Sequence, residues 1–180
     1  MGYHLLKNGE ELLVESARGQ DAAEILQFLR IAAGESDYLL STAEDFPKDV
    51  AAERAWLKNQ AAQPNALALC GKLHGRVVAF ANLVPPRQRR GAHTAELSLL
   101  VGKPLWGQGA GRAMMEALLR FAKDSGTLRL LHLGVRQDNT AAIALYESLG
   151  FARCGVLKGY FCVNGRYYDE VLMHLWLPEG

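Results

Sequence analysis

A glycine-rich segment between a predicted strand and a predicted helix carries the clearest chemical signal in the sequence. The run GKPLWGQGAGR occupies residues 102–112. Glycines let a backbone approach a ligand closely, and the free N–H groups at a helix start favour an anion, particularly a phosphate. A Walker-type loop would need Lys and then Ser or Thr where Gln108 and Gly109 stand, and a dinucleotide fingerprint would need glycine in place of Arg112. These two nucleotide patterns are excluded, whereas a phosphate-binding helix start and a simple tight turn both remain open.

Two other side chains have the chemistry to move protons. Glu96 is the only carboxylate in the apolar strand predicted for residues 94–101, and period-2 alternation places Ser98 on its face. Tyr146 lies in a helix predicted to end at Leu149, and its neutral phenol can donate a hydrogen bond. The structural alternatives are an exposed strand-face carboxylate for Glu96 and a core aromatic ring for Tyr146.

The elements that must position these residues follow from hydrophobic periodicity and turn signals. Helices are predicted from residue 22 to Gly34, from about Lys48 to Gln60, from near Gly109 until just before Gly126, and from Asn139 or Thr140 to Leu149. Strands are predicted at residues 11–16, 66–72, 76–84, 94–101, 128–135, 151–163 and 166–177, the last two joined by the hairpin turn Asn164-Gly165. The acidic segment 35–47 is predicted to be a loop. This order predicts one α/β (α+β) domain over residues 1–180, with helices packed on a mostly antiparallel sheet.

Composition excludes several classes of protein. The chain has 180 residues, 49% of them hydrophobic and 22% charged, with a formal net charge of +1. Such a balance gives no overall electrostatic case for nucleic acid or an anionic membrane. No apolar run is long enough to span a bilayer, and the first residues do not resemble a targeting segment. The three cysteines form no Cys-x-x-Cys pair and the five histidines are scattered, so we expect a cytoplasmic protein with reduced thiols and no metal.

The segment ELSLLVGKPLWGQGAGRAMMEALL resembles the central motif of the GCN5-related N-acetyltransferase superfamily. That motif reads Gln/Arg-x-x-Gly-x-Gly/Ala after a strand. Gly109 and Gly111 match its two small positions, whereas Trp106 stands at the Gln/Arg position and removes one polar side chain. A tryptophan there is similar to the branch that includes ribosomal-protein alanine acetyltransferases.

Two later segments extend the resemblance to about half of the chain. The stretch LGVRQDNTAAIALYESLGF, residues 133–151, resembles the strand and helix that follow the central motif in the superfamily, and GRYYDEVLM resembles the last strand of many small members. The resemblance implies a sheet splayed between its fourth and fifth strands, counted as predicted above, with about four flanking helices and acetyl-CoA lying in the wedge.

The resemblance also implies roles for individual residues. Glu96 would be the general base that helps to deprotonate an acceptor amine, and Tyr146 the general acid for the departing thiolate. Asn139 could either cap its helix or contact the cofactor. The residues implied to bind acetyl-CoA are Leu99 and Val101 through their backbone, Gly107, Gln108, Gly109, Ala110, Gly111 and Arg112 around its pyrophosphate, and Asn139. The acidic loop would help to form the acceptor site.

The function implied is acetyl transfer from acetyl-CoA to a primary amine by direct attack in a ternary complex. No cysteine stands in either motif, so a covalent acetyl-enzyme is not favoured. The alternative is a non-catalytic module that binds or senses acyl-CoA. The acceptor could be a small-molecule amine or a protein N-terminus, and a homodimer is one option for the assembly.

Overall fold

A computed structural model describes residues 1–46 and 49–178 of the chain. The strands are β1 (Gly2–Leu5), β2 (Glu11–Ser16), β3 (Leu67–Leu73), β4 (Arg76–Val84), β5 (Thr94–Val101), β6 (Leu130–Arg136), β7 (Ala152–Val163) and β8 (Arg166–Trp176). The helices are α1 (Ala22–Gly34), α2 (Val50–Ala61), α3 (Ala110–Asp124) and α4 (Thr140–Ser148).

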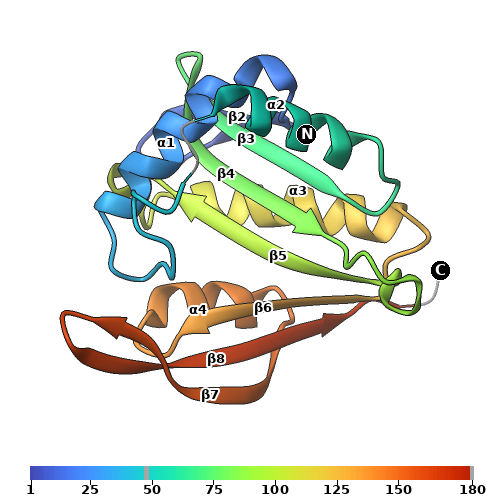
Figure 1. Cartoon of the computed structure of the whole chain (residues 1–180). Helices are drawn as coiled ribbons and strands as arrows, with labels where there is room; N and C mark the ends of the chain where they lie inside the picture. The colour runs from blue at the N-terminus through green and yellow to red at the C-terminus, as the bar shows by residue number, and fades with distance from the viewer. Residues whose placement is uncertain (47–48, 179–180) are drawn as a thin grey trace.

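All the strands join one sheet in the order β1-β2-β3-β4-β5-β6-β8-β7. Every neighbouring pair is antiparallel except β5 and β6, which run parallel. That parallel pair is short, because only Thr94–Glu96 are in register with Leu130–His132. Beyond Glu96 the two strands separate, and Figure 1 shows the sheet divided at this point into a β1–β5 half and a β6–β8 half.

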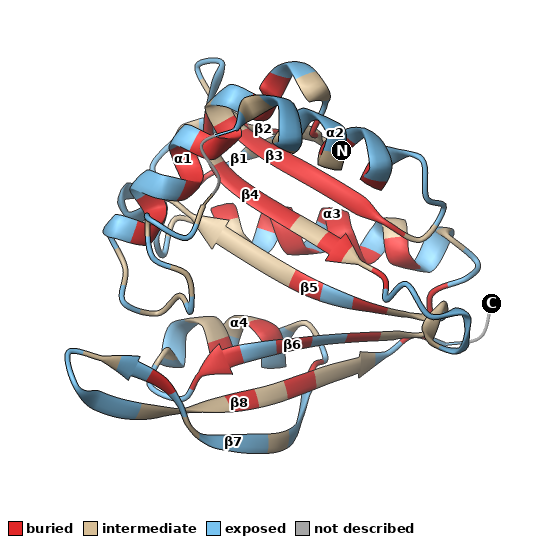
Figure 2. Cartoon of the chain, in the orientation of Figure 1, coloured by how far each residue is buried: buried red, intermediate tan, exposed pale blue. Residues whose placement is uncertain are grey.

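The helices cover the two faces of the sheet unequally. Helices α1 and α2 pack on β3 and β4 around a core that includes Ile25, Leu57 and Phe80. On the opposite face α3 and α4 pack on a larger core that includes Met114, Leu118 and Leu131. Figure 2 shows α3 burying one side of its length and β7 exposed along most of its own. We call the first surface the α1/α2 face; its part over β6, β7 and β8 carries neither helix (Figure 1).

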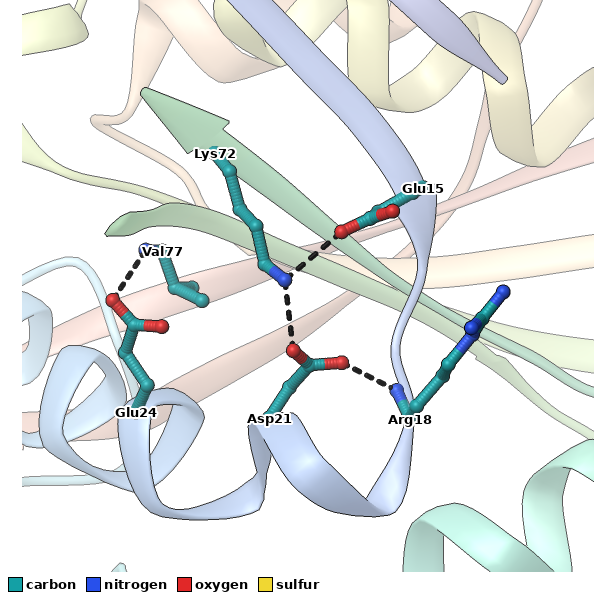
Figure 3. A network of polar contacts seen from close by, with 6 residues as sticks. All are labelled: Glu15, Arg18, Asp21, Glu24, Lys72 and Val77. Carbon is teal, nitrogen blue, oxygen red and sulfur yellow. Dashed lines mark hydrogen bonds and ion pairs between the residues drawn. The ribbon is translucent and has the colours of Figure 1, made fainter. Parts of the chain in front are cut away.

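An ion-pair network fastens the start of α1 to the sheet (Figure 3). The Lys72 ammonium on β3 lies 2.9 Å from a Glu15 carboxylate oxygen on β2 and 2.7 Å from Asp21 Oδ1. The other Asp21 oxygen accepts from the backbone N–H of Arg18 at 2.8 Å. Burial would lower the pKa of Lys72, but the hydrogen bonds to Asp21 and Glu15 outweigh it and raise that pKa. The network therefore fixes α1 on the sheet through a charged lysine.

The predicted fold class is confirmed, and the predicted strands and helices are present. The splay lies between residues 94–101 and 130–136, as expected, but these are the fifth and sixth strands because β1 precedes the first predicted one. Strand β1 was not predicted, since four residues with alternating half-burial carry too weak a periodic signal. The predicted helix start near Lys48 and the loop end at Pro47 lie outside the described residues, and α2 is described from Val50 with Asp49 as its cap.

Candidate active site

The splay leaves part of the β5 backbone without a strand partner. The N–H of Gly102 donates to the carbonyl of Val78 on β4 at 2.9 Å, so alternate residues of β5 direct their backbone groups toward β4. By this alternation Leu99 and Val101 direct theirs into the gap between β5 and β6. The backbone of Leu99 and the N–H of Val101 are thus available to a ligand lying in the gap.

The glycine-rich segment turns the chain from β5 into α3. Gly107 and Gly109 have φ values of +73° and +100°, a region that glycine adopts without strain. Gly109 is the N-cap of α3, and no side chain caps the helix there. The first N–H groups of a helix have no intrahelical acceptor, so those of residues 110–112 are available to an anion. Among the described residues, no atom lies within 4 Å of a Cβ added at Gly107 or Gly109, so space lies open above the loop.

Trp106 fills the position where the superfamily motif has Gln or Arg, and it has a structural role. Its indole N–H donates to the carbonyl of Val101 at 2.8 Å, and its ring centroid lies 6.3 Å from that of Tyr38. This hydrogen bond closes the turn after β5. The tryptophan thereby links the glycine loop to the segment between α1 and α2.

Tyr146 on α4 is a buried aromatic residue whose hydroxyl is free. Its ring packs against Phe151 with centroids 6.0 Å apart. The hydroxyl has no hydrogen-bond partner among the described residues, yet it is not one of the side-chain atoms sealed from solvent. Burial raises the pKa of the phenol to about 12, so it stays protonated at neutral pH.

Asn139 caps α4, since its side-chain oxygen accepts from the N–H of Ala142 at 3.2 Å. Asn139 therefore has the predicted helix-capping role, and it also lines the cavity described next. Arg112 resembles Asn139 in lining that cavity while also making a structural contact. Its guanidinium donates to Ser148 Oγ at 2.7 Å and so ties α3 to α4.

A cavity of about 510 Å³ joins these features. It lies between the end of β5, the glycine loop, the start of α4 and the segment between α1 and α2. Most of the sequence-predicted residues line it: Leu99, Val101, Gly107, Gly109, Gly111, Arg112, Asn139 and Tyr146. Three do not: Glu96, which is described next, Gln108 and Ala110. Gln108 lies beside the cavity, with its carbonyl accepting from the N–H of Lys7 at 3.0 Å, and Ala110 is fully buried.

Glu96 stands outside the lining of the cavity. It is exposed on the α1/α2 face, at the last position where β5 and β6 are in register. Ser98 shares that face and donates to Asn82 on β4 at 2.8 Å. The carboxylate therefore lies where the gap begins, and the glycine loop lies at the other end of the strand.

The structure adds cavity residues that sequence reasoning missed. Lys7 comes from the turn between β1 and β2, and Ser36, Tyr38 and Leu39 come from the segment between α1 and α2. Among the acidic residues of that segment, Glu35 accepts from the N–H of Lys103 at 3.3 Å and Asp45 accepts from Thr42, which lowers the pKa of Asp45. These contacts are internal, so the neutral residues of the loop, and not its carboxylates, face the cavity.

Other candidate groups lie elsewhere. Arg87, Arg89 and Arg90 are exposed before the start of β5, a whole strand away from the glycine loop. Cys70 is fully buried, and that burial together with the charge of Asp21 raises the pKa of its thiol to about 12, so it is no nucleophile. Within residues 1–46 and 49–178, no group of three or more His, Cys, Asp or Glu side chains could hold a metal ion. In the same ranges, no helix combines the length and apolarity needed to cross a membrane.

A mixed sheet split beside an uncapped helix start, with free backbone groups along one side of the gap, defines the class of acyl-CoA-dependent N-acetyltransferase folds. The model of the Acetyltransferase (GNAT) family matches residues 32–151, and the chain belongs to that family. The matched range contains the glycine loop, α3, β6 and α4.

Curated relatives resemble the chain over segments of different length. N-alpha-acetyltransferase RimI of Mycobacterium tuberculosis is 44% identical over 59 residues, 33% of this chain and 35% of that protein. The [Ribosomal protein bS18]-alanine N-acetyltransferase of Escherichia coli is 41% identical over 68 residues, 38% of this chain and 45% of that protein. The chain thus spans less than half the length of these two relatives. It is 28% identical to the L-methionine sulfoximine/L-methionine sulfone acetyltransferase of Pseudomonas aeruginosa over 72% of its own length and 75% of the relative's.

Solved structures share the fold over nearly the whole chain. A GNAT-family acetyltransferase from Streptococcus pneumoniae superposes with a TM-score of 0.90 at 29% identity, covering 93% of this chain and 100% of that one. A ribosomal-protein-alanine N-acetyltransferase from Brucella melitensis gives 0.79 at 28% identity, covering 92% and 99%. The similarity to the ribosomal-protein alanine acetyltransferase branch is therefore confirmed, at a distant level.

Proposed function

We propose that this protein transfers the acetyl group of acetyl-CoA to a primary amine by direct attack in a ternary complex. The observation that carries the proposal is the single cavity that joins the uncapped start of α3, the unpaired backbone of Leu99 and the free hydroxyl of Tyr146. A phosphate-binding end, a hydrogen-bonding edge and a proton donor are what a bound thioester of coenzyme A requires.

The residues present fit the co-substrate. The open space above Gly107 and Gly109 would admit the pyrophosphate, and the N–H groups of residues 110–112 would donate to it. The backbone of Leu99 and Val101 would pair with the pantetheine arm as a strand would. In this arrangement the side chains of Arg112 and Asn139 keep their contacts with Ser148 and Ala142, and the carbonyl of Gln108 keeps its contact with Lys7. Ala110 contributes its backbone N–H.

The protons can be accounted for with two side chains. An acceptor amine is mostly an ammonium ion near neutral pH and must lose one proton before it can attack; Glu96 takes that proton. The nitrogen lone pair then forms the C–N bond, the C–S bond breaks, and the thiolate is protonated with the help of Tyr146. A second proton leaves the nitrogen as the amide forms and replaces the one that Tyr146 donates, while the third stays on the amide. Coenzyme A therefore leaves as a thiol, and the one net proton released is the proton that Glu96 took.

We propose an α-amino group as the acceptor, carried by a small amino-acid derivative or by a protein N-terminus. The support comes from two of the relatives, whose names specify ribosomal-protein alanine and L-methionine sulfone as acceptors.

The experiment measures release of free thiol from acetyl-CoA across a panel of L-amino acids, L-methionine sulfone, amino-acid amides and peptides beginning with alanine. Thermal unfolding with acetyl-CoA and coenzyme A is recorded in parallel, because a ligand that binds only the folded state raises the melting temperature. We expect both stabilisation and turnover with at least one α-amine. Stabilisation without turnover across the panel would favour the acyl-CoA-binding alternative, and neither effect would overturn the assignment of the cavity.

A further inference from the structure

Glycine at position 134 of β6 makes room for a carboxylate from another strand. A Cβ added at Gly134 would overlap the Glu170 carboxylate, which therefore occupies the space that a side chain at position 134 would take. Glu170 itself is on β8, in register with Arg136. Its side chain thus crosses diagonally to β6, to the position two residues before its register partner Arg136, and so points toward the narrow end of the gap.

This carboxylate is not engaged by any other group that the structure describes. Among the described residues, no salt bridge and no hydrogen bond involves it. Its register neighbour Arg136 is committed elsewhere, with 2.7 and 3.1 Å hydrogen bonds to Asp138 and one of 2.6 Å to the carbonyl of Asp37. Glu170 is only half exposed, so burial raises its pKa, and the negative charge of Glu96 raises it further.

Glu170 and Glu96 face the same region from opposite sides of the split. Glu96 is in register with His132 on β6, and Gly134 follows two residues later on the same strand face. This is the α1/α2 face, in its part without a covering helix (Figure 1). An acceptor reaching the gap from this side would pass between the two carboxylates.

Resting on the proposed function, we propose that Glu170, seated over Gly134, binds the ammonium group of the acceptor and holds it for deprotonation by Glu96. Glu170 then determines specificity for a cationic acceptor and remains a carboxylate throughout. A cation between the two groups would offset the mutual repulsion that the fold otherwise tolerates.

Other charged and titratable groups on this face also contribute to the electrostatic potential at the Glu170 carboxylate. Strand β7 places Leu157 beside Glu170 and contributes no charge in that register. From β5, β6, β8 and the α1–α2 segment, the groups are Glu96, His132, Arg136, Tyr168, His174 and Tyr38.

The test uses three variants of the full chain and L-alaninamide as the acceptor. Glu170→Gln removes the charge and keeps the shape. Gly134→Ala leaves Glu170 intact but displaces its carboxylate. Gly155→Ala is the matched control, since a Cβ there would meet only Leu172 at an ordinary 3.6 Å.

At pH 6.5 we expect Glu170→Gln and Gly134→Ala to raise the KM for L-alaninamide by 10-fold or more, with kcat changed by less than 3-fold. The effect should shrink toward pH 9, because an α-amine with a pKa near 8 then arrives neutral. The melting-temperature shift caused by acetyl-CoA should match the parent in all three variants. Glu170→Gln should also unfold at a higher temperature than the parent at neutral pH, since a carboxyl with a raised pKa costs stability once ionised.

An unchanged KM in Glu170→Gln, or a loss of equal size at pH 6.5 and pH 9, would overturn the assignment. Calorimetric binding of L-alaninamide to the protein saturated with coenzyme A gives a readout that needs no turnover. A parent that binds L-alaninamide tenfold more tightly than Glu170→Gln, but transfers no acetyl group, would support the role of Glu170 and contradict the proposed function.

Discussion

At the scale of single residues, the role proposed for Glu96 as general base can be tested directly, because its carboxylate stands exposed where β5 and β6 separate. Glu96→Gln should lower kcat by about 100-fold, within the range for lost general-base help, while the affinity for acetyl-CoA is unchanged. The loss should narrow at high pH as the amine deprotonates unaided. A pH–rate profile unchanged in height and shape would leave solvent or another carboxylate as the base.

Tyr146 offers a second prediction, which separates packing from proton donation. Tyr146→Phe keeps the ring against Phe151 and removes only the free hydroxyl. We expect kcat to fall by roughly 10- to 1000-fold with little change in melting temperature. Because burial raises the pKa of the phenol to about 12, the parent should show no loss of rate from Tyr146 ionisation up to about pH 10. A lower melting temperature with full turnover would make Tyr146 a core residue only.

At the scale of elements, two glycines at the turn into α3 are required for different reasons. Gly109 has a positive φ and an open space where its Cβ would be, whereas a Cβ at Gly111 would stand 3.3 Å from Leu145 and 3.6 Å from Leu99. Gly111 therefore lets α3 pack closely on α4 and β5. Gly109 is the better position for testing the ligand, because a substitution there meets only backbone strain in the free protein.

Gly109→Ala and Gly126→Ala form a matched pair for this loop. Both glycines have positive φ and no protein atom within 4 Å of an added Cβ, but Gly126 lies after the far end of α3. Each variant should lose about 1–2 kcal/mol of stability from the strained backbone. Only Gly109→Ala should weaken binding of acetyl-CoA, by 10-fold or more when measured by calorimetric titration. Equal affinities in the two variants would contradict the phosphate-binding assignment of the loop.

Features of the site could be predicted from the sequence where their residues lie close together in the chain, and not where they depend on contacts between distant segments. The glycine loop, Asn139 and Tyr146 lie in short motifs, and the structure gathers them around one cavity. Lys7 and Tyr38 were missed because they reach the cavity through pairing and packing between distant segments. Glu170 is the clearest case: its position depends on the absence of a side chain at Gly134, and only the register of β6 with β8 brings the two together.

At the scale of the whole molecule, the two halves of the split sheet are joined by the short β5–β6 pairing, by the shared core under α3 and α4, and by Arg136. This side chain is 6% exposed and lies between the rings of Tyr38 and Tyr168, 4.6 and 4.3 Å from their centroids. Its 2.6 Å hydrogen bond to the carbonyl of Asp37 links β6 to the segment between α1 and α2. Arg136 therefore closes the wide end of the gap, next to cavity residues Ser36 and Leu39.

Arg136→Met should loosen this connection across the molecule. Loss of charge-assisted hydrogen bonds worth roughly 1.5–3 kcal/mol should lower the melting temperature by roughly 3–10 °C. Amide hydrogen exchange of residues 36–39 should accelerate, and acetyl-CoA should slow it again by bridging both halves from within the cavity. Arg153→Met is the control, because Arg153 makes a solvent-exposed pair with Glu147 that contributes less than about 1 kcal/mol. Unchanged exchange at residues 36–39 in Arg136→Met would show that the two halves are held together without this arginine, by the β5–β6 pairing and the shared core under α3 and α4.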